Sequence, residues 1–289
     1  MPHDTANYPT ARLKLAGGLC GIVALSDSAG HVFSAANWTA CLAEPEKLQC
    51  DPQEVLKREG ENSVIVKALN VGNTEVNAVV KARLEKRCPF SFRLDRAIRN
   101  FEKAIFLRNA GIPAEIPLAA LRQKKGVFVE RSIYLTEYVP QSVSLHWFAK
   151  KDLPTMPNQP AIKHNLARRL AEILAALHEN GLWHRDAKPS NILVHKSSDG
   201  RYEPMLIDLD GIKCYGGLRT FSRRFRPFAH LAVLRSVSPF VHTTDCLRTF
   251  TIYCNLTGVD KVARKRLFRR LINGLAAKRL ESLAAKGRA

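Results

Sequence analysis

The sequence predicts an α+β protein in which a strand-rich first half is followed by a mainly helical second half. Two observations carry this prediction. Between residues 54 and 139, short runs rich in β-branched residues alternate with turn residues, which is typical of antiparallel strands. Beyond residue 140, apolar residues recur every three to four positions, which is typical of amphipathic helices. The 289 residues suffice for one large domain or for two lobes sharing a cleft.

Residues 1–53 have little periodicity and are rich in Gly, Ser, Ala and Asn. We interpret them as an N-terminal extension, with room for a short strand or helix, and assign no chemistry to them. The apolar stretch 13–25 contains Lys14 and is shorter than the about 20 residues that cross a bilayer. It also lacks the pattern of a signal peptide. Any membrane contact is therefore expected to be peripheral.

Residues 54–139 are predicted to form a lobe with a five-stranded antiparallel sheet and one helix. The helix, residues 93–110, has apolar side chains at three-to-four spacing and is stopped by Gly111 and Pro113. Three strands precede it and two follow it. The predicted strands are residues 55–58, 63–69, 75–84, 116–121 and 127–138.

Residues 140–289 are predicted to form a helical lobe. Its clearest helix, residues 162–180, has an apolar face and ends at Asn180-Gly181. A polar loop and a short hairpin, residues 192–195 and 205–209, come next, and mainly helical sequence follows. A strand-rich lobe before a helical lobe is the expected outline of a bilobal kinase.

The composition points to an anionic partner. Lys and Arg number 45 against 26 Asp and Glu, a formal net charge of +19, which favours nucleic acid, an anionic membrane surface or phosphorylated substrates. The seven cysteines contain no C-x-x-C pair, which argues against a disulfide framework and a structural zinc site. Reduced thiols in the cytosol are the simplest interpretation.

The polar loop carries the clearest chemical signal. Residues 184–191 read His-Arg-Asp-Ala-Lys-Pro-Ser-Asn, the spacing of the H-R-D-x-x-x-x-N loop in which a carboxylate accepts the proton of an acceptor hydroxyl. We predict that Asp186 is this base and that Asn191 is a Mg²⁺ ligand. Lys188 is placed to neutralise the phosphate transferred from ATP. The alternative is a structural Asp in an ordinary turn.

A second carboxylate is expected on the following hairpin. Asp208, in Leu-Ile-Asp-Leu-Asp-Gly at 206–211, is preceded by two apolar strand residues and takes the place of the metal-binding Asp of a D-F-G motif. Asp210 departs from that motif, and we favour a turn-capping role for it over a further metal contact.

The N-terminal lobe is predicted to bind the rest of the nucleotide. Lys81, in Ala-Val-Val-Lys at 78–81, resembles the phosphate-binding lysine of the V-A-I-K pattern. A buried lysine requires a carboxylate partner, and we assign Glu102 in the helix, since Glu115 lies outside it. No G-x-G-x-x-G occurs, so Gly60 is the one candidate in the phosphate-covering loop 57–63. The adenine is expected near Glu137 and Val139.

The residues quoted so far resemble the protein-kinase superfamily, and within it the bacterial lipopolysaccharide core kinase (Kdo/WaaP) family. The segment 99–113, which ends in Ala-Gly-Ile-Pro, is similar to that family's glutamate helix. Asp-Leu-Asp at 208–210 resembles its metal motif, and the basic segments from Arg224 onward are similar to its short helical tail. The similarity covers roughly residues 54–272.

The resemblance implies transfer of phosphate to a heptose or Kdo hydroxyl of lipopolysaccharide core at the cytosolic face of the inner membrane. The absence of Ala-Pro-Glu after Asp208 favours a non-peptide acceptor. Two alternatives stay open: a protein or small-molecule kinase of the same superfamily, and a non-catalytic pseudokinase or basic binding module. No nucleic-acid motif accompanies the basic runs. Residues suited to an anionic membrane surface are Lys261, Arg264, Lys265, Arg266, Arg269 and Arg270.

Overall fold

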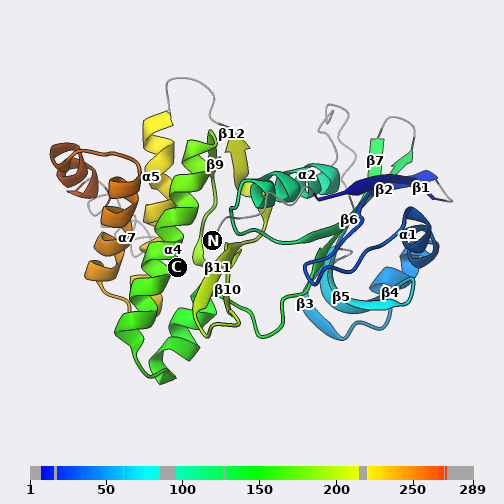
Figure 1. Cartoon of the computed structure of the whole chain (residues 1–289), viewed down its shortest axis with the longest axis horizontal. Helices are drawn as coiled ribbons and strands as arrows, with labels where there is room; N and C mark the ends of the chain where they lie inside the picture. The colour runs from blue at the N-terminus through cyan, green and yellow to red at the C-terminus, as the bar shows by residue number, and fades with distance from the viewer. Residues whose placement is uncertain are drawn as a thin grey trace, which may run out of the picture. The chain divides into compact units, whose positions relative to one another are not determined.

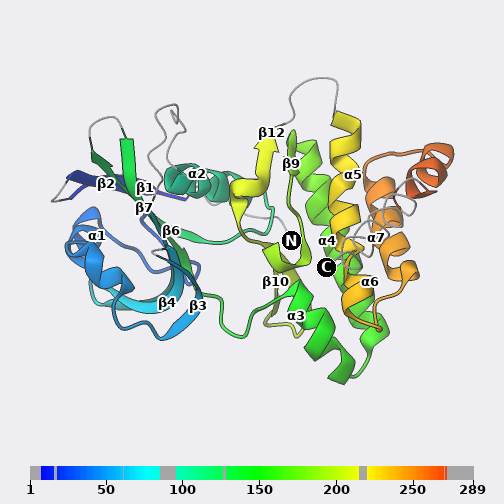
Figure 2. The ribbon, with the colours of Figure 1, turned by 180° about the vertical axis from the view of Figure 1, so that it is seen from behind.

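The computed structural model describes residues 8–15, 18–60, 62–84, 96–125, 128–214, 220–269 and 271. The chain divides into two compact units, Met1–Val139 and Pro140–Ala289 (Figures 1 and 2). Each unit has a different kind of core, and each contains part of the predicted chemistry.

The first unit is built on a seven-stranded antiparallel sheet, with strand order β1-β2-β6-β7-β5-β4-β3. This is two strands more than the sequence predicts, because β1 and β2 come from the N-terminal 53 residues. β2 pairs with β6 and β1 with β2, so the N-terminal hairpin covers what would otherwise be a sheet edge. The strands are β1 (Thr10–Lys14), β2 (Leu19–Ala24), β3 (Glu54–Glu59), β4 (Asn62–Val71), β5 (Thr74–Leu84), β6 (Pro117–Lys125) and β7 (Phe128–Glu137).

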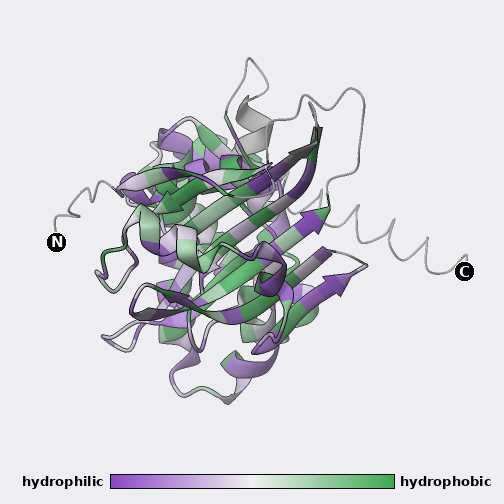
Figure 3. Ribbon diagram, turned by 90° about the vertical axis from the view of Figure 1, so that its right-hand side faces the viewer, coloured by the Kyte–Doolittle hydropathy of each residue, from purple (hydrophilic) through white to green (hydrophobic). Residues whose placement is uncertain are grey.

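Helices pack on both faces of this sheet. Alternate residues of a strand point to opposite faces, so Ile133 packs in one hydrophobic cluster and Tyr134 in another. Helix α1 (Ala35–Cys41) supplies Trp38 to the first cluster, and α2 (Arg96–Asn109) supplies Phe101 to the second. Figure 3 shows hydrophobic and hydrophilic segments succeeding one another along the strands. The short 3-10 helix η2 (Pro45–Gln49) completes this unit.

The predicted helix before β6 is present as α2, and Gly111 follows it. Gly111 has φ +69°, a backbone conformation that glycine adopts without a steric penalty. Its N–H donates to the carbonyl of Arg108, and that of Ile112 donates to Leu107, so the last helical carbonyls are satisfied. This turn leads the chain directly into β6.

The second unit is organised around α4 (Gln159–Glu179), which packs against α7 (Thr243–Leu256). The buried rings of Phe228, Phe250 and Tyr253 join α5 to α7, and Tyr253 also shares a 2.6 Å hydrogen bond with His178 of α4. The other helices are α3 (Leu145–Trp147), the π-helix η3 (Phe148–Asp152), η4 (Leu153–Thr155), η5 (Pro189–Asn191), η6 (Leu209–Gly211), α5 (Thr220–Leu231) and α6 (Leu234–Val237).

Two small sheets position the polar loop of this unit. One has the order β11-β10-β8 and the other pairs β12 with β9, all antiparallel. The strands are β8 (Val143–Ser144), β9 (Leu182–His184), β10 (Ile192–Lys196), β11 (Tyr202–Leu206) and β12 (Ile212–Cys214). Among the described residues, no helix is both long enough and apolar enough to span a bilayer.

Candidate active site

The loop 184–191 is held at both ends by β12 and by the connection between β11 and β12. Its first end is β9, which pairs with β12, and the N–H of Arg185 donates to the carbonyl of Gly211 at 2.8 Å. At the other end, the N–H of Ile207 donates to the carbonyl of Asn191 at 3.0 Å. The turn that carries Asp208 is therefore fixed against the loop that carries Asp186.

The carboxylate of Asp186 is surrounded by polar groups of its own loop. Its Oδ2 lies 3.0 Å from Nζ of Lys188 and accepts from Nδ2 of Asn191 at 3.4 Å, while Nδ2 also donates to the Asp186 carbonyl at 2.9 Å. Partial burial acts to raise the pKa of Asp186, but the hydrogen bond and charge of Lys188 outweigh it and leave the pKa lowered. The group is therefore ionised at neutral pH, as a proton acceptor must be.

His184 is a structural support for this loop. Its ring is fully buried, and burial lowers its pKa to about 4, so the imidazole is neutral. Its Nδ1 accepts the N–H of Asp186 at 3.2 Å. Gly211 lies against the same ring, and a Cβ there would be 2.6 Å from Nδ1. Glycine at 211 thus lets the two segments approach closely.

Asn191 and Asp208 offer the oxygen donors that Mg²⁺ prefers. Asn191 is buried and uses its amide nitrogen on Asp186, which leaves its amide oxygen as the possible ligand. Asp208 is exposed and has φ 58°, a left-handed conformation that costs a non-glycine residue about 1 kcal/mol or more. Both side chains thus offer the type of oxygen donor that a magnesium ion takes, and their role as its ligands stays a prediction.

Lys81 is paired with Glu115 instead of the predicted Glu102. Its Nζ lies 2.5 Å from Oε2 of Glu115, whose side chain is 3% exposed, and 5.4 Å from the centre of the Tyr134 ring. Glu102 is exposed, because it follows Phe101, which is buried against the sheet, and successive helical residues point about 100° apart. Glu115 lies just before β6, and this position is the sequence feature that marks it as the alternative partner.

The remaining predicted residues lie on the edges of the first unit. Gly60, with φ +58°, is in the turn that joins β3 to β4. At the end of β7, the N–H of Glu137 donates to Ile116, and Val139 is the last residue of the unit. The carboxylate of Glu137 accepts from both the N–H and the hydroxyl of Ser28, a contact with the N-terminal segment that the sequence did not predict. Their nucleotide-binding roles stay predictions.

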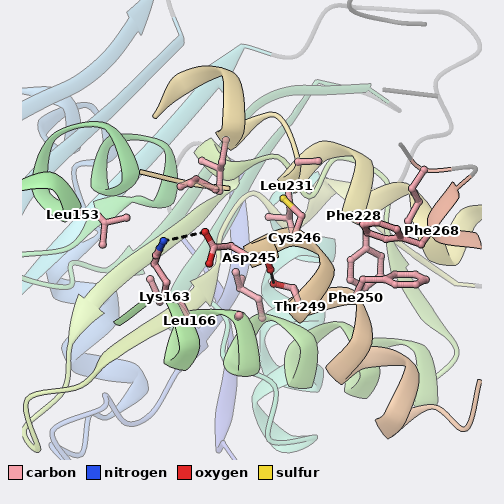
Figure 4. Close-up of a pocket in the computed structure, with 16 residues that line it drawn as sticks. Leu153, Lys163, Leu166, Phe228, Leu231, Asp245, Cys246, Thr249, Phe250 and Phe268 are labelled. Atoms are coloured by element: carbon pink, nitrogen blue, oxygen red, sulfur yellow. Dashed lines mark hydrogen bonds and ion pairs between the residues drawn. The ribbon is translucent and has the colours of Figure 1, made fainter. Parts of the chain in front are cut away.

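An apolar pocket lies elsewhere in the second unit, among α4, α5, α7 and the segment after α7 (Figure 4). Its polar wall is formed by Lys163 and Asp245, which bind each other at 3.1 Å. None of the predicted site residues lines it. The pocket is therefore separate from the loop around Asp186, where the sequence predicts the chemistry.

Two comparisons with known proteins each cover more than half of the chain. The model of the lipopolysaccharide kinase (Kdo/WaaP) family matches residues 75–237. A solved structure of WaaP in complex with acyl carrier protein has a TM-score of 0.54 and 19% identity, and the match covers 80% of this chain and 97% of that one. At that identity the likeness concerns the fold.

Curated relatives match over a shorter part. The serine/threonine-protein kinase ksp1 of Schizosaccharomyces pombe is 33% identical over 78 residues, which is 27% of this chain and 16% of the relative. PkaA of Streptomyces coelicolor is 39% identical over 64 residues, 22% of this chain and 11% of the relative. The family match spans more than half of the sequence. The chain therefore belongs to the lipopolysaccharide kinase (Kdo/WaaP) family, and it has a kinase-like fold.

Proposed function

We propose that this protein transfers the γ-phosphate of ATP to a sugar hydroxyl, on heptose or Kdo, of lipopolysaccharide core. The observation that carries the proposal is the pairing of an ionised Asp186 with Lys188 inside a loop whose far end is tied to the Asp208 turn. These groups provide a base, a phosphate-side cation and metal ligands, which phosphoryl transfer requires.

Each residue has a separate task. Asp186 accepts a hydrogen bond from the acceptor hydroxyl and takes its proton as the oxygen attacks the γ-phosphorus. Lys188, whose ammonium lies 3.0 Å from that carboxylate, stabilises negative charge on the transferred phosphoryl group. Lys81, held by Glu115, binds the phosphates of ATP. Asn191 and Asp208 would hold Mg²⁺, which when bound neutralises charge on the phosphates.

The acceptor class is supported by the family and by charge. The helical segment 261–269 carries five basic residues, of which Lys261, Lys265, Arg266 and Arg269 are exposed, while Leu267 is buried. Each basic residue near an anionic bilayer contributes about 1 kcal/mol of binding. We propose that this surface binds the inner face of the cytoplasmic membrane, where an anionic glycolipid acceptor is available.

Asp186→Asn tests the reaction. The variant loses the proton acceptor but keeps the size and shape of the side chain, so we expect transfer to fall by at least about 100-fold with ATP affinity retained. The measurement is incorporation of radiolabelled phosphate from ATP into core oligosaccharide. Asp199→Asn, an exposed carboxylate in the β10–β11 turn, is the control and should keep full activity.

The outcomes separate the alternatives. Near-normal turnover of Asp186→Asn would show that Asp186 is not the catalytic base. Labelling of protein substrates but never of the oligosaccharide would favour a protein kinase. Nucleotide binding without transfer to any acceptor would favour a non-catalytic module.

A further inference from the structure

The carboxylate of Glu115 is held by a single hydrogen bond. Its Oε2 accepts from Nζ of Lys81 at 2.5 Å. Its Oε1 is buried and has no hydrogen-bond partner among the residues that the structure describes. Because the carboxylate makes no second hydrogen bond there, its position depends on the backbone that carries it, residues 114–116.

The backbone on either side of Glu115 is held by two residues from outside this segment. Arg108, in the last turn of α2, donates from Nη1 to the carbonyl of Ala114 at 3.1 Å. Glu137, at the end of β7, donates its N–H to the carbonyl of Ile116 at 2.8 Å. The segment that carries Glu115 is therefore fixed from two sides, by the end of α2 and by the end of β7.

Each of these two holding residues is in turn bound by the N-terminal segment. Nε of Arg108 donates to the hydroxyl of Tyr8 at 2.7 Å, and the guanidinium lies 5.2 Å from the centre of the Tyr8 ring. The carboxylate of Glu137 accepts from the N–H of Ser28 at 3.2 Å and from the hydroxyl of the same residue. Tyr8 precedes β1 and Ser28 follows β2, so both lie at the open end of one hairpin.

We propose that Tyr8 and Ser28 are positioning residues for the phosphate-binding lysine, and that they act through Glu115. The proposal rests on the proposed function, in which Lys81 binds the phosphates of ATP. The hairpin fixes the two residues that hold the backbone beside Glu115, and the carboxylate of Glu115 then holds the ammonium of Lys81. A group that is held in place before its ligand arrives binds more tightly, because less conformational freedom is lost on binding. The N-terminal hairpin thereby sets the affinity for ATP.

The experiment measures the dissociation constant for ATP at equilibrium in Tyr8→Phe and in Ser28→Ala. Each variant loses one hydroxyl, and phenylalanine keeps the aromatic ring beside the guanidinium. We expect the ATP dissociation constant to rise by about 3- to 10-fold in each, the range for loss of one hydrogen bond, with KM for the acceptor at saturating ATP unchanged. Thr39→Ala is the matched control, because it removes a hydroxyl of the same N-terminal segment that donates to Ala35 of its own helix.

A double-mutant cycle separates positioning from a general loss of stability. In a Glu115→Ala background no carboxylate holds Lys81 at this position, so Tyr8→Phe and Ser28→Ala should leave the ATP dissociation constant as it is. A Lys81→Met background carries the same expectation and takes the place of the first if Glu115→Ala does not fold. Residues that merely stabilise the sheet would weaken ATP binding by the same factor in every background.

Two results would overturn the inference. The first is an ATP dissociation constant equal to that of the wild type in either Tyr8→Phe or Ser28→Ala. The second is a rise by the same factor in the wild-type and the Glu115→Ala or Lys81→Met backgrounds, which would make the hairpin a purely structural element. If Lys81→Met alone binds ATP as tightly as the wild type, the role of Lys81 in the proposed function fails first and the inference falls with it, so the two failures are distinguished.

Discussion

At the residue scale, the partner of Lys81 is the most informative difference from the prediction. Glu115 lies at the entry to β6 and is almost fully buried, whereas Glu102 is exposed on α2. Lys81 and Tyr134 are directly opposite each other in the β5–β7 pair, on the face of the sheet that α2 covers. The lysine is thus on the helix side, but the carboxylate that reaches it comes from the loop after the helix.

Glu115→Gln should therefore impair the enzyme far more than Glu102→Gln. The first change leaves the ammonium of Lys81 without its buried counter-charge, a loss that costs about 3–5 kcal/mol in buried pairs, and less here because Lys81 is 24% exposed. The second removes an exposed charge and should be within about 0.5 kcal/mol of the wild type. Urea unfolding and the KM for ATP measure both effects. If the two variants had the same unfolding free energy and the same KM for ATP, Glu115 would not be the functional partner of Lys81.

At the element scale, the loop 184–191 and the connection between β11 and β12 behave as one unit, because His184 and Gly211 are in close contact. Gly211→Ala places a methyl group where only 2.6 Å separates it from His184 Nδ1. Since that ring is fully buried, it has little room to move, and overpacking typically costs about 1–3 kcal/mol. We expect a lower unfolding temperature and reduced turnover. Gly200→Ala, in the exposed β10–β11 turn, controls for glycine replacement, although its φ of +82° adds backbone strain.

The same element gives the stability of the protein a pH dependence. In the unfolded chain His184 titrates near its ordinary value of 6.5, and in the folded protein burial lowers its pKa to about 4. Between these two values the unfolded state binds more protons, so stability falls as the pH is lowered from 6.5 to 4, by at most about 3 kcal/mol. His184→Gln should flatten this part of the curve of unfolding free energy against pH. An unchanged slope would show that other groups cause it.

At the scale of the whole molecule, the N-terminal segment is part of the first unit's core. Trp38 is fully buried, donates its Nε1–H to the carbonyl of Ala24 at 2.7 Å, and packs beside Val23, Leu42 and Ile65. β1 and β2 extend the sheet that carries Lys81. Residues 8–15 and 18–53 therefore belong to the structure that positions the lysine, although they supply none of the predicted reacting groups.

Trp38→Ala should be strongly destabilising. Removing a fully buried tryptophan leaves a cavity and an unbonded carbonyl, which costs about 3–5 kcal/mol. Trp147→Ala, at a tryptophan that is 47% exposed, is the matched control and should cost much less. Chemical denaturation followed by circular dichroism compares the two. A Trp38 variant as stable as the Trp147 variant would show that the N-terminal segment is dispensable.

The parts of the site that the sequence alone determined are those within a few residues of one another. The spacing of Asp186, Lys188 and Asn191 along one loop brings them together whatever surrounds them, so their contacts follow from local geometry. The order of strands and helices was predictable for a similar reason, because periodicity is a local property. Only the tertiary structure decided the partner of Lys81, the two strands added by the N-terminal segment, and the contact of Tyr8 with the end of α2. Each of these depends on which sheet edge is left to be paired or which face of a helix is turned inward, and those choices are made by packing between segments far apart in the chain.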